Sequence, residues 1–173
     1  MNKKVIIQDL TLMLLQMNNS YLSKAGGKAG GMAAGHVKWL GFPFATDVQY
    51  LENSLAAGFI ISSVEDMSRY LLMHMNNGQF ANQSIVSEGG TTELQRPGTV
   101  KEGNSDYVMG LVNLSLDDLD LIGHDGSTPG FNAGMAFAPE NQWGVVVLTN
   151  TSAQVELTAF PLVLGVMELI SYR

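Results

Sequence analysis

The sequence contains no cysteine, which excludes disulfide bridges, thiolate nucleophiles and cysteine metal ligands. The same absence does not identify a compartment, because many exported bacterial proteins also lack cysteine. Basic residues are scarce as well: nine Lys and Arg stand against sixteen Asp and Glu, the formal charge is -7, and no basic cluster exceeds Lys3-Lys4. A chain of this charge lacks the basic surface that neutralises phosphates, so we expect no nucleic-acid partner.

The sequence also lacks a long uninterrupted apolar run. Its first residues include a basic pair, as a signal peptide would, but Gln8 and Asp9 interrupt the apolar stretch and no small-residue cleavage site follows closely. The spacing of apolar residues over 5–17 instead predicts an amphipathic helix. Residues 155–170 are rich in Leu and Val, yet they include two glutamates and a proline and fall short of the roughly 20 residues of a membrane span. We therefore expect a buried terminal helix there, with Ser152 as its cap.

No metal or cofactor motif is present. His36, His74 and His124 lack the spacing of paired metal ligands, and no carboxylate accompanies them in such a pattern. We expect His36 and His74 to be structural residues, the latter packed or half-exposed on a helix. The glycine-rich residues 25–35 include Lys28, but the next residue is Ala rather than Ser or Thr, which favours a surface loop over a phosphate-binding loop. The prediction is no metal and no cofactor.

Composition and periodicity predict a single globular domain of the α+β class. The chain has 173 residues, 46% hydrophobic and 14% charged, enough to bury a core. Residues 1–100 read mainly as helices and loops, 107–150 as antiparallel strands, and 152–172 as a C-terminal helix. The clearest helix begins after Ser63, whose hydroxyl can cap the backbone at Asp66, and Gly78 ends it.

The strands are predicted from alternating or continuous apolar runs separated by turn residues. Residues 99–106 read as a charged loop. A turn at 117–118 joins the first two strands, and the short polar segment 139–142 joins the last two into a hairpin. The four predicted strands are Tyr107 to Leu114, Leu119 to Gly123, Phe131 to Ala138 and Trp143 to Thr149. Between the second and third lie the triplet His124-Asp125-Gly126 and a glycine-containing turn over 127–130.

This ordered set of motifs resembles the third motif of the serine β-lactamase and penicillin-binding protein superfamily, in the branch of class C β-lactamases, DD-peptidases and esterases. The matching pieces, in order, are "HDG", "PGF", "PE" and "GVVVLTN", and the helix after Ser63 matches the family at the corresponding place. The resemblance covers nearly the whole chain but only the C-terminal part of the family's fold. It implies an antiparallel sheet packed with helices, a partial β-lactamase/transpeptidase-like fold lacking the N-terminal part.

The resemblance also implies roles for three residues. His124 would donate a hydrogen bond or positive charge to the substrate carboxylate or tetrahedral intermediate. Gly126 closes the triplet, and the backbone N–H of Ser127 would be an oxyanion donor. The family acylates the serine of S-x-x-K and uses Y-x-N or S-x-N as its second motif, but neither occurs in this sequence. A triad of Ser127, His124 and Asp125 is geometrically poor, because neighbours on a strand point to opposite faces.

These observations leave several hypotheses open. The first is the C-terminal fragment of a β-lactamase-like serine hydrolase, inactive alone, whose complete relatives cleave peptidoglycan peptides, β-lactams or small esters. The second is a non-catalytic binding or oligomerising module, and the third an unrelated β-sheet domain with a chance triplet. A sheet without its N-terminal strands exposes an edge, so we expect a homo-oligomer or a separately encoded N-terminal half as partner. The resemblance implies an exported or membrane-anchored origin, whereas the sequence itself shows no leader.

Overall fold

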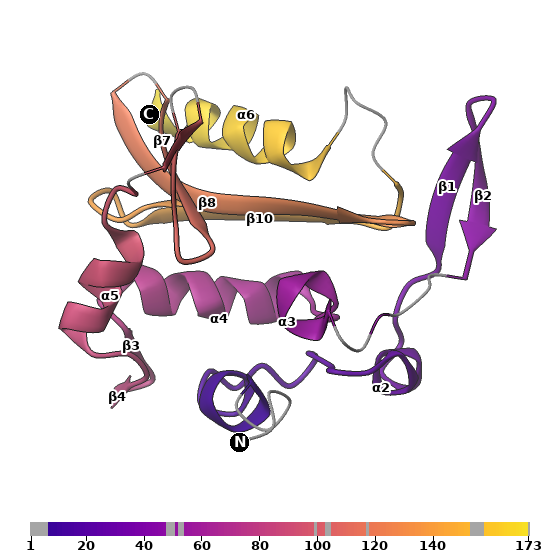
Figure 1. Ribbon diagram of the computed structural model, residues 1–173, viewed down its shortest axis with the longest axis horizontal. Coiled ribbons are helices and arrows are strands. Elements are labelled where there is room, and N and C mark those ends of the chain that lie inside the picture. Colours follow the sequence, from indigo (N-terminus) through magenta and orange to yellow (C-terminus); the bar gives the residue numbers. More distant parts are fainter. Residues whose placement is uncertain are drawn as a thin grey trace.

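A computed structural model describes residues 7–47, 51, 54–98, 100–102, 105–116, 118–152 and 158–172. Its centre is a six-stranded antiparallel sheet in the order β10-β9-β8-β7-β6-β5 (Figure 1). The strands are β5 (Val100–Glu102), β6 (Ser105–Val108), β7 (Leu111–Leu116), β8 (Leu119–Thr128), β9 (Phe131–Ala138) and β10 (Trp143–Thr149). The predicted α+β class with an antiparallel sheet is confirmed.

Helices cover both faces of this sheet. Helix α6 (Ala159–Ser171) lies on one face and α4 (Val64–Met75) on the other (Figure 1). The α6 side buries Val163 and Met167 against β8 and β9, and the α4 side buries Leu71 against Phe137. Gly134 allows the close approach of α6, because a Cβ there would lie 2.9 Å from the backbone nitrogen of Phe160.

The N-terminal segment packs on the outer side of α4. A π-helical turn, η1 (Gln8–Leu12), and turns up to Met17 bury Leu12 and Leu15 in a second core with Leu55 and Met73. The other elements are α2 (Lys24–Ala29), α3 (Leu55–Gly58), α5 (Glu88–Gln95) and two small hairpins, β1 (Gly35–Trp39) with β2 (Phe42–Thr46) and β3 (Gln79–Phe80) with β4 (Gln83–Ser84). None of the described helices combines the length and the hydropathy of a membrane-spanning segment.

The helix after Ser63 forms as predicted. The Ser63 hydroxyl accepts a hydrogen bond from the backbone N–H of Asp66 at 3.2 Å, which caps the first turn of α4. The Asp66 side chain is fully buried: one oxygen accepts from the Asn19 N–H and the Ser20 hydroxyl, and the other pairs with Arg69 at 2.8 Å. This network fastens the N-terminal segment to α4.

Several predictions of local structure are wrong. The glycine-rich segment is partly helical, because the Ser23 hydroxyl caps α2 and Gly27 packs against Ile61. The predicted first strand is two strands, β6 and β7, since Met109 and Gly110 both have positive φ and turn the chain between them. Residues 100–102 and 105–106 are strand rather than loop.

The ends of the chain also differ from the prediction, first at the C-terminal helix. Its N-cap is Thr158, and the Ser152 hydroxyl accepts from the Gly130 N–H at 2.6 Å instead of capping a helix. The first residues of the predicted N-terminal helix lie outside the described residues, and from Gln8 to Met17 the chain forms the π-helical turn followed by turns.

Candidate functional site

The predicted site residues lie on the last part of β8. This strand pairs with β7 over Leu119–Gly123 and with β9 over Ile122–Thr128. Residues 124–128 therefore have β9 on one side, and among the described residues no strand pairs with their other side. We call that side of residues 124–128 the open edge. An antiparallel strand paired on one side only directs alternate backbone N–H groups outward from its free side.

His124 is half-buried, whereas Asp125, Gly126 and Ser127 are exposed. The His124 ring lies against Tyr107 of β6, with ring centroids 6.1 Å apart and planes inclined at 62°. Tyr107 is itself 51% exposed, so it stands at the surface beside the imidazole. This pair could not be predicted from the sequence, because it depends on how β6, β7 and β8 align.

The space around Gly126 is empty. A Cβ built at this residue would meet nothing within 4 Å, and its φ is not in the left-handed region. Gly123, three residues earlier, differs: a Cβ there would lie 2.4 Å from the carbonyl oxygen of Met135. Packing within the described chain thus explains the glycine at 123 and leaves room above the glycine at 126.

The turn after β8 is held by polar contacts with the segment that follows β10. Thr128 still belongs to β8, and the turn consists of Pro129 and Gly130 rather than residues 127–130 as predicted. The Asn132 side-chain amide donates to the Thr151 carbonyl at 2.6 Å, next to the contact of Ser152 with Gly130. These bonds fix the end of the sheet that holds Ser127.

His36 reaches the same end of the sheet from β1. Its backbone N–H donates to the Asn150 carbonyl at 2.9 Å, and its carbonyl accepts from the Ser152 N–H at 2.7 Å. The ring nitrogen Nδ1 lies 3.2 Å from the same Asn150 carbonyl oxygen. The contacts of His36 are therefore structural, and they hold β1 beside the β8–β9 turn.

The structure does not assemble a triad on β8. Among the described residues, no side-chain hydrogen bond joins Ser127 to His124 or Asp125 in the structure, although the three are close in sequence. In the same part of the chain, no three His, Asp or Glu side chains gather where they could hold a metal ion.

His74 lies far from this strand end, in the core beneath β9. Its ring stacks on Phe137 with centroids 5.4 Å apart and meets Tyr70 edge-on at 4.7 Å. Burial lowers the pKa of His74 from 6.5 to about 4, so the ring is neutral at pH 7. The residue packs in the core, which is one of the two placements that the sequence predicted.

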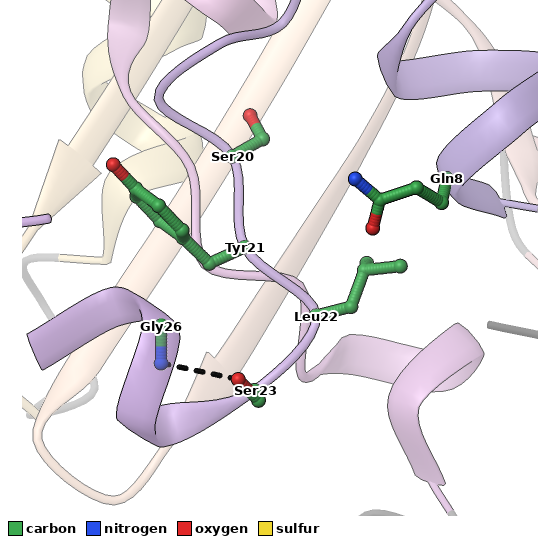
Figure 2. Close-up of a pocket in the computed structure, with 6 residues that line it drawn as sticks. All are labelled: Gln8, Ser20, Tyr21, Leu22, Ser23 and Gly26. Carbon is green, nitrogen blue, oxygen red and sulfur yellow. Dashed lines mark hydrogen bonds between the residues drawn. The ribbon is translucent and has the colours of Figure 1, made fainter. Parts of the chain in front are cut away.

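An open concavity of about 340 Å³ lies among the N-terminal segments (Figure 2). It is lined by Gln8, Ser20, Tyr21, Leu22, Ser23 and Gly26. The Ser23 hydroxyl is occupied by the N–H of Gly26, and the Ser20 hydroxyl donates to Asp66. The hydroxyls of both serines are engaged in holding the fold, so the concavity offers little chemistry of its own.

Known structures resemble this fold closely. The octameric penicillin-binding protein homologue from Pyrococcus abyssi superposes with a TM-score of 0.80 at 23% identity, over 97% of this chain and 37% of its own. The class C β-lactamase from Rhodobacter sphaeroides gives 0.76 at 19% identity, over 99% of this chain and 54% of its own. The β-lactamase/D-alanine carboxypeptidase from Pseudomonas syringae gives 0.71 at 18%, over 90% and 50%. The chain thus spans roughly 37% to 54% of the length of these proteins.

At these identities, the structural likeness shows a shared fold and nothing more. Among curated protein sequences, none matches this chain significantly. The sequence model of the family described as Beta-lactamase matches residues 4–165, which is most of the chain. The resemblance inferred from the motifs is confirmed, and this chain belongs to the Beta-lactamase family.

Proposed function

We propose that this chain is the C-terminal part of a β-lactamase-like serine hydrolase and forms one wall of its active site. In this proposal, the serine that becomes acylated comes from sequence outside this chain, because S-x-x-K and Y-x-N are absent from its 173 residues. The chain alone forms no acyl-enzyme. The reaction of the complete site is hydrolysis of an amide or ester bond.

The observation that carries this proposal is the open edge with the empty space above Gly126. A tetrahedral intermediate needs backbone N–H donors that are already in place where negative charge develops. Alternate N–H groups of residues 124–128 face a side that no described strand occupies. A serine brought against this edge would find donors and room together.

Each site residue then has a chemical role. The Ser127 N–H donates to the oxyanion, and Gly126 leaves the space that an acyl group needs. The His124 imidazole donates a hydrogen bond to the substrate carboxylate or to the intermediate, and the Tyr107 ring restricts its movement from one side. The similar proteins named as a class C β-lactamase and a D-alanine carboxypeptidase support β-lactams and peptidoglycan peptides as substrates, with small esters as a third class.

Two further surfaces support a partner that completes the fold. Strand β10 ends the sheet and pairs only with β9 among the described strands. The outer face of α6 exposes Leu162, Val166 and Leu169 at helical spacing, and Leu169 is 71% exposed. An unpaired strand beside an apolar helix face favours association. We propose a separately encoded N-terminal half, or a second copy of this chain, as the partner, and the octameric homologue supports self-association.

A second candidate is a non-catalytic binding or oligomerising module. The absence of both upstream motifs favours it, because the same exposed surfaces serve assembly without any chemistry. The two candidates differ in one respect: only the first gains hydrolytic activity when a chain carrying S-x-x-K and Y-x-N is added.

The test is the intact mass of the purified chain after incubation with a fluorophosphonate or a penicillin. The incubation is done with this chain alone and with this chain mixed with a second chain that carries S-x-x-K and Y-x-N. We expect no adduct on this chain, an adduct on the added serine, and hydrolysis that is lost in His124→Ala. A stoichiometric adduct on this chain would overturn the proposal, and Ser127→Ala would identify the serine. No adduct on either chain, with the two chains shown to associate, would favour the non-catalytic module.

A further inference from the structure

The β1–β2 hairpin carries an uncovered apolar face. In an antiparallel pair, residues directly opposite each other point to the same side. Val37 lies opposite Phe44, and Trp39 lies opposite Phe42, so these four side chains share one face. Figure 1 shows the hairpin standing apart from the main sheet and the helices, joined to them at its base.

Exposure is greatest toward the tip. Trp39 is 67% exposed, Phe42 68% and the turn residue Leu40 77%, whereas Phe44, nearer the base, is 49% exposed. The rings of Trp39 and Phe44 lie edge-to-face with centroids 6.2 Å apart. Exposed apolar groups that gather at one protruding point indicate an interaction surface, unlike single ones scattered over a protein.

The backbone of the tip is strained at an apolar residue. Leu40 and Gly41 form the two-residue turn with φ of +49° and +84°. This left-handed turn favours Asn-Gly, and a bulky aliphatic side chain in that region is rare. The chain therefore accepts a conformational cost to hold an exposed leucine at the end of the hairpin, where the leucine contributes little to the fold.

The charge of this segment differs from that of the rest of the chain. Residues 10–46 contain no Asp or Glu and three Lys, although the whole chain has sixteen acidic residues. Lys24 and Lys28 pair with Asp47 at 2.8 and 3.4 Å. Within the hairpin itself Lys38 is the only charged residue, and it lies on the face opposite the apolar one. The tip can thus approach a neutral or negative surface without repulsion from its own residues.

A second hairpin is a poor occupant for this face. An aromatic side chain buries about 150–250 Å², so three that are half to two-thirds exposed present on the order of 400 Å². Two hairpins packed face to face would bury about 800 Å² in total, less than the roughly 1,000 Å² that a specific protein interface requires. Binding to a bilayer requires no shape-complementary interface, because individual apolar side chains can insert between the lipids.

We propose that the tip of the β1–β2 hairpin inserts into the interface of a phospholipid bilayer. Trp39, Leu40 and Phe42 enter the boundary between headgroups and acyl chains, where aromatic side chains accumulate. Lys38 remains at the level of the headgroups and is attracted to anionic ones. One short hairpin gives a reversible attachment rather than a permanent anchor. The attachment is independent of the hydrolytic role proposed above.

The test is sedimentation of the full chain with two kinds of vesicle: phosphatidylcholine alone, and phosphatidylcholine mixed with phosphatidylglycerol. We expect binding to both, with a blue shift of tryptophan emission and quenching by brominated lipid. The chain has two tryptophans. Trp39→Phe should keep the binding and lose the blue shift, which assigns the shift to the hairpin.

Three variants sharpen the test. Asn suits the left-handed turn, so Leu40→Asn should unfold at the same or a higher urea concentration than the parent chain. Its binding to vesicles should nevertheless be about tenfold weaker, and Phe42→Ser should weaken binding to a similar extent. Lys38→Glu should weaken binding to the anionic vesicles about fivefold or more and leave binding to phosphatidylcholine alone unchanged. The matched control is Met109→Asn, which replaces an exposed apolar residue that also has a positive φ and precedes a glycine, in the turn between β6 and β7; it should bind as the parent chain does.

Three outcomes would overturn the proposal. One is a chain that stays in the supernatant with both kinds of vesicle. This result counts against the proposal whether the free chain is a monomer or forms a dimer that Phe42→Ser disrupts. Another is a loss of binding in Met109→Asn as large as in Leu40→Asn, since any exposed apolar group would then suffice. The third is emission that does not shift while the protein binds, because the hairpin would then lie outside the bilayer.

Discussion

His74 should make the stability of this protein fall in mild acid. Neither of its ring nitrogens has a hydrogen-bond partner among the described residues, and Tyr70 and Phe137 contact the ring. Burial lowers the folded-state pKa from 6.5 to about 4, because desolvation disfavours the imidazolium. The unfolded chain therefore binds this proton at a higher pH than the folded chain does.

The sign and size of the effect follow from that difference. The contribution of neutral His74 is fully present above pH 6.5 and is lost as the pH falls toward 4. A shift of this size corresponds to about 3 kcal/mol in all, of which about 2 kcal/mol is lost between pH 7 and pH 5. The urea midpoint should fall over that range.

The variant His74→Phe isolates the effect. Phenylalanine keeps an aromatic ring beside Phe137 and removes two buried nitrogens without partners, so we expect it to be at least as stable as the parent at neutral pH. Its advantage should grow by about 2 kcal/mol between pH 7 and pH 5. His124→Gln, which retains His74, is the control and should follow the parent curve.

Urea denaturation followed by circular dichroism between pH 5 and 7.5 gives the required free energies. Carboxylates that titrate in this range contribute equally to the parent and to His74→Phe, so the difference between the two curves reports His74. Parallel curves would refute the reasoning, because the ring would then titrate alike in the folded and unfolded chains.

Three further predictions concern the fold and its partner surface. Asp66→Asn should destabilise the chain by about 2 kcal/mol in urea denaturation, because it removes the charge of a fully buried carboxylate that pairs with the partly exposed Arg69. The exposed Asp120→Asn should change stability little, and equal midpoints for the two variants would contradict this. Gly126→Ala should leave the melting temperature within about a degree or two of the parent, while Gly123→Ala should lower it markedly, since its Cβ would collide with backbone; the reverse order would show that the open space is misassigned. Leu169→Glu should reduce self-association in sedimentation at micromolar concentration without lowering stability, and unchanged association would exclude the outer face of α6 as the contact.

The sequence predicted best those elements whose signals are local. The hydroxyl of Ser63 followed by Asp66 is such a signal, and so is the pair of apolar runs around the polar turn at 139–142. The prediction failed where the decisive partner is distant. Gly27 belongs to a helix because Ile61 covers it, and the Met109-Gly110 turn lacks the Asn or Asp that usually indicates such turns.

The residues of the candidate site also differ in whether the sequence could predict them. His124, Gly126 and Ser127 could be proposed from the triplet because the motif is contiguous and the family resemblance gives it meaning, and their roles stay a prediction. Tyr107 could not, since its contact with His124 depends on strands β6 to β8 pairing in one particular register. The apolar face of the β1–β2 hairpin was missed for a related reason: Trp39 and Phe42 share a face only once the two-residue turn is known.

The glycines of the sheet separate what the fold requires from what the site requires. Gly123 and Gly134 have backbone atoms within 3 Å of where a Cβ would stand, so the strands and α6 explain them. Gly130 has a positive φ and closes the turn after β8. Gly126 has neither a close neighbour nor a left-handed backbone, and glycine weakens a strand interior. Glycine at 126 therefore weakens the strand, and no contact within the described chain requires it. This is the pattern expected where a substrate or a partner chain must approach the backbone.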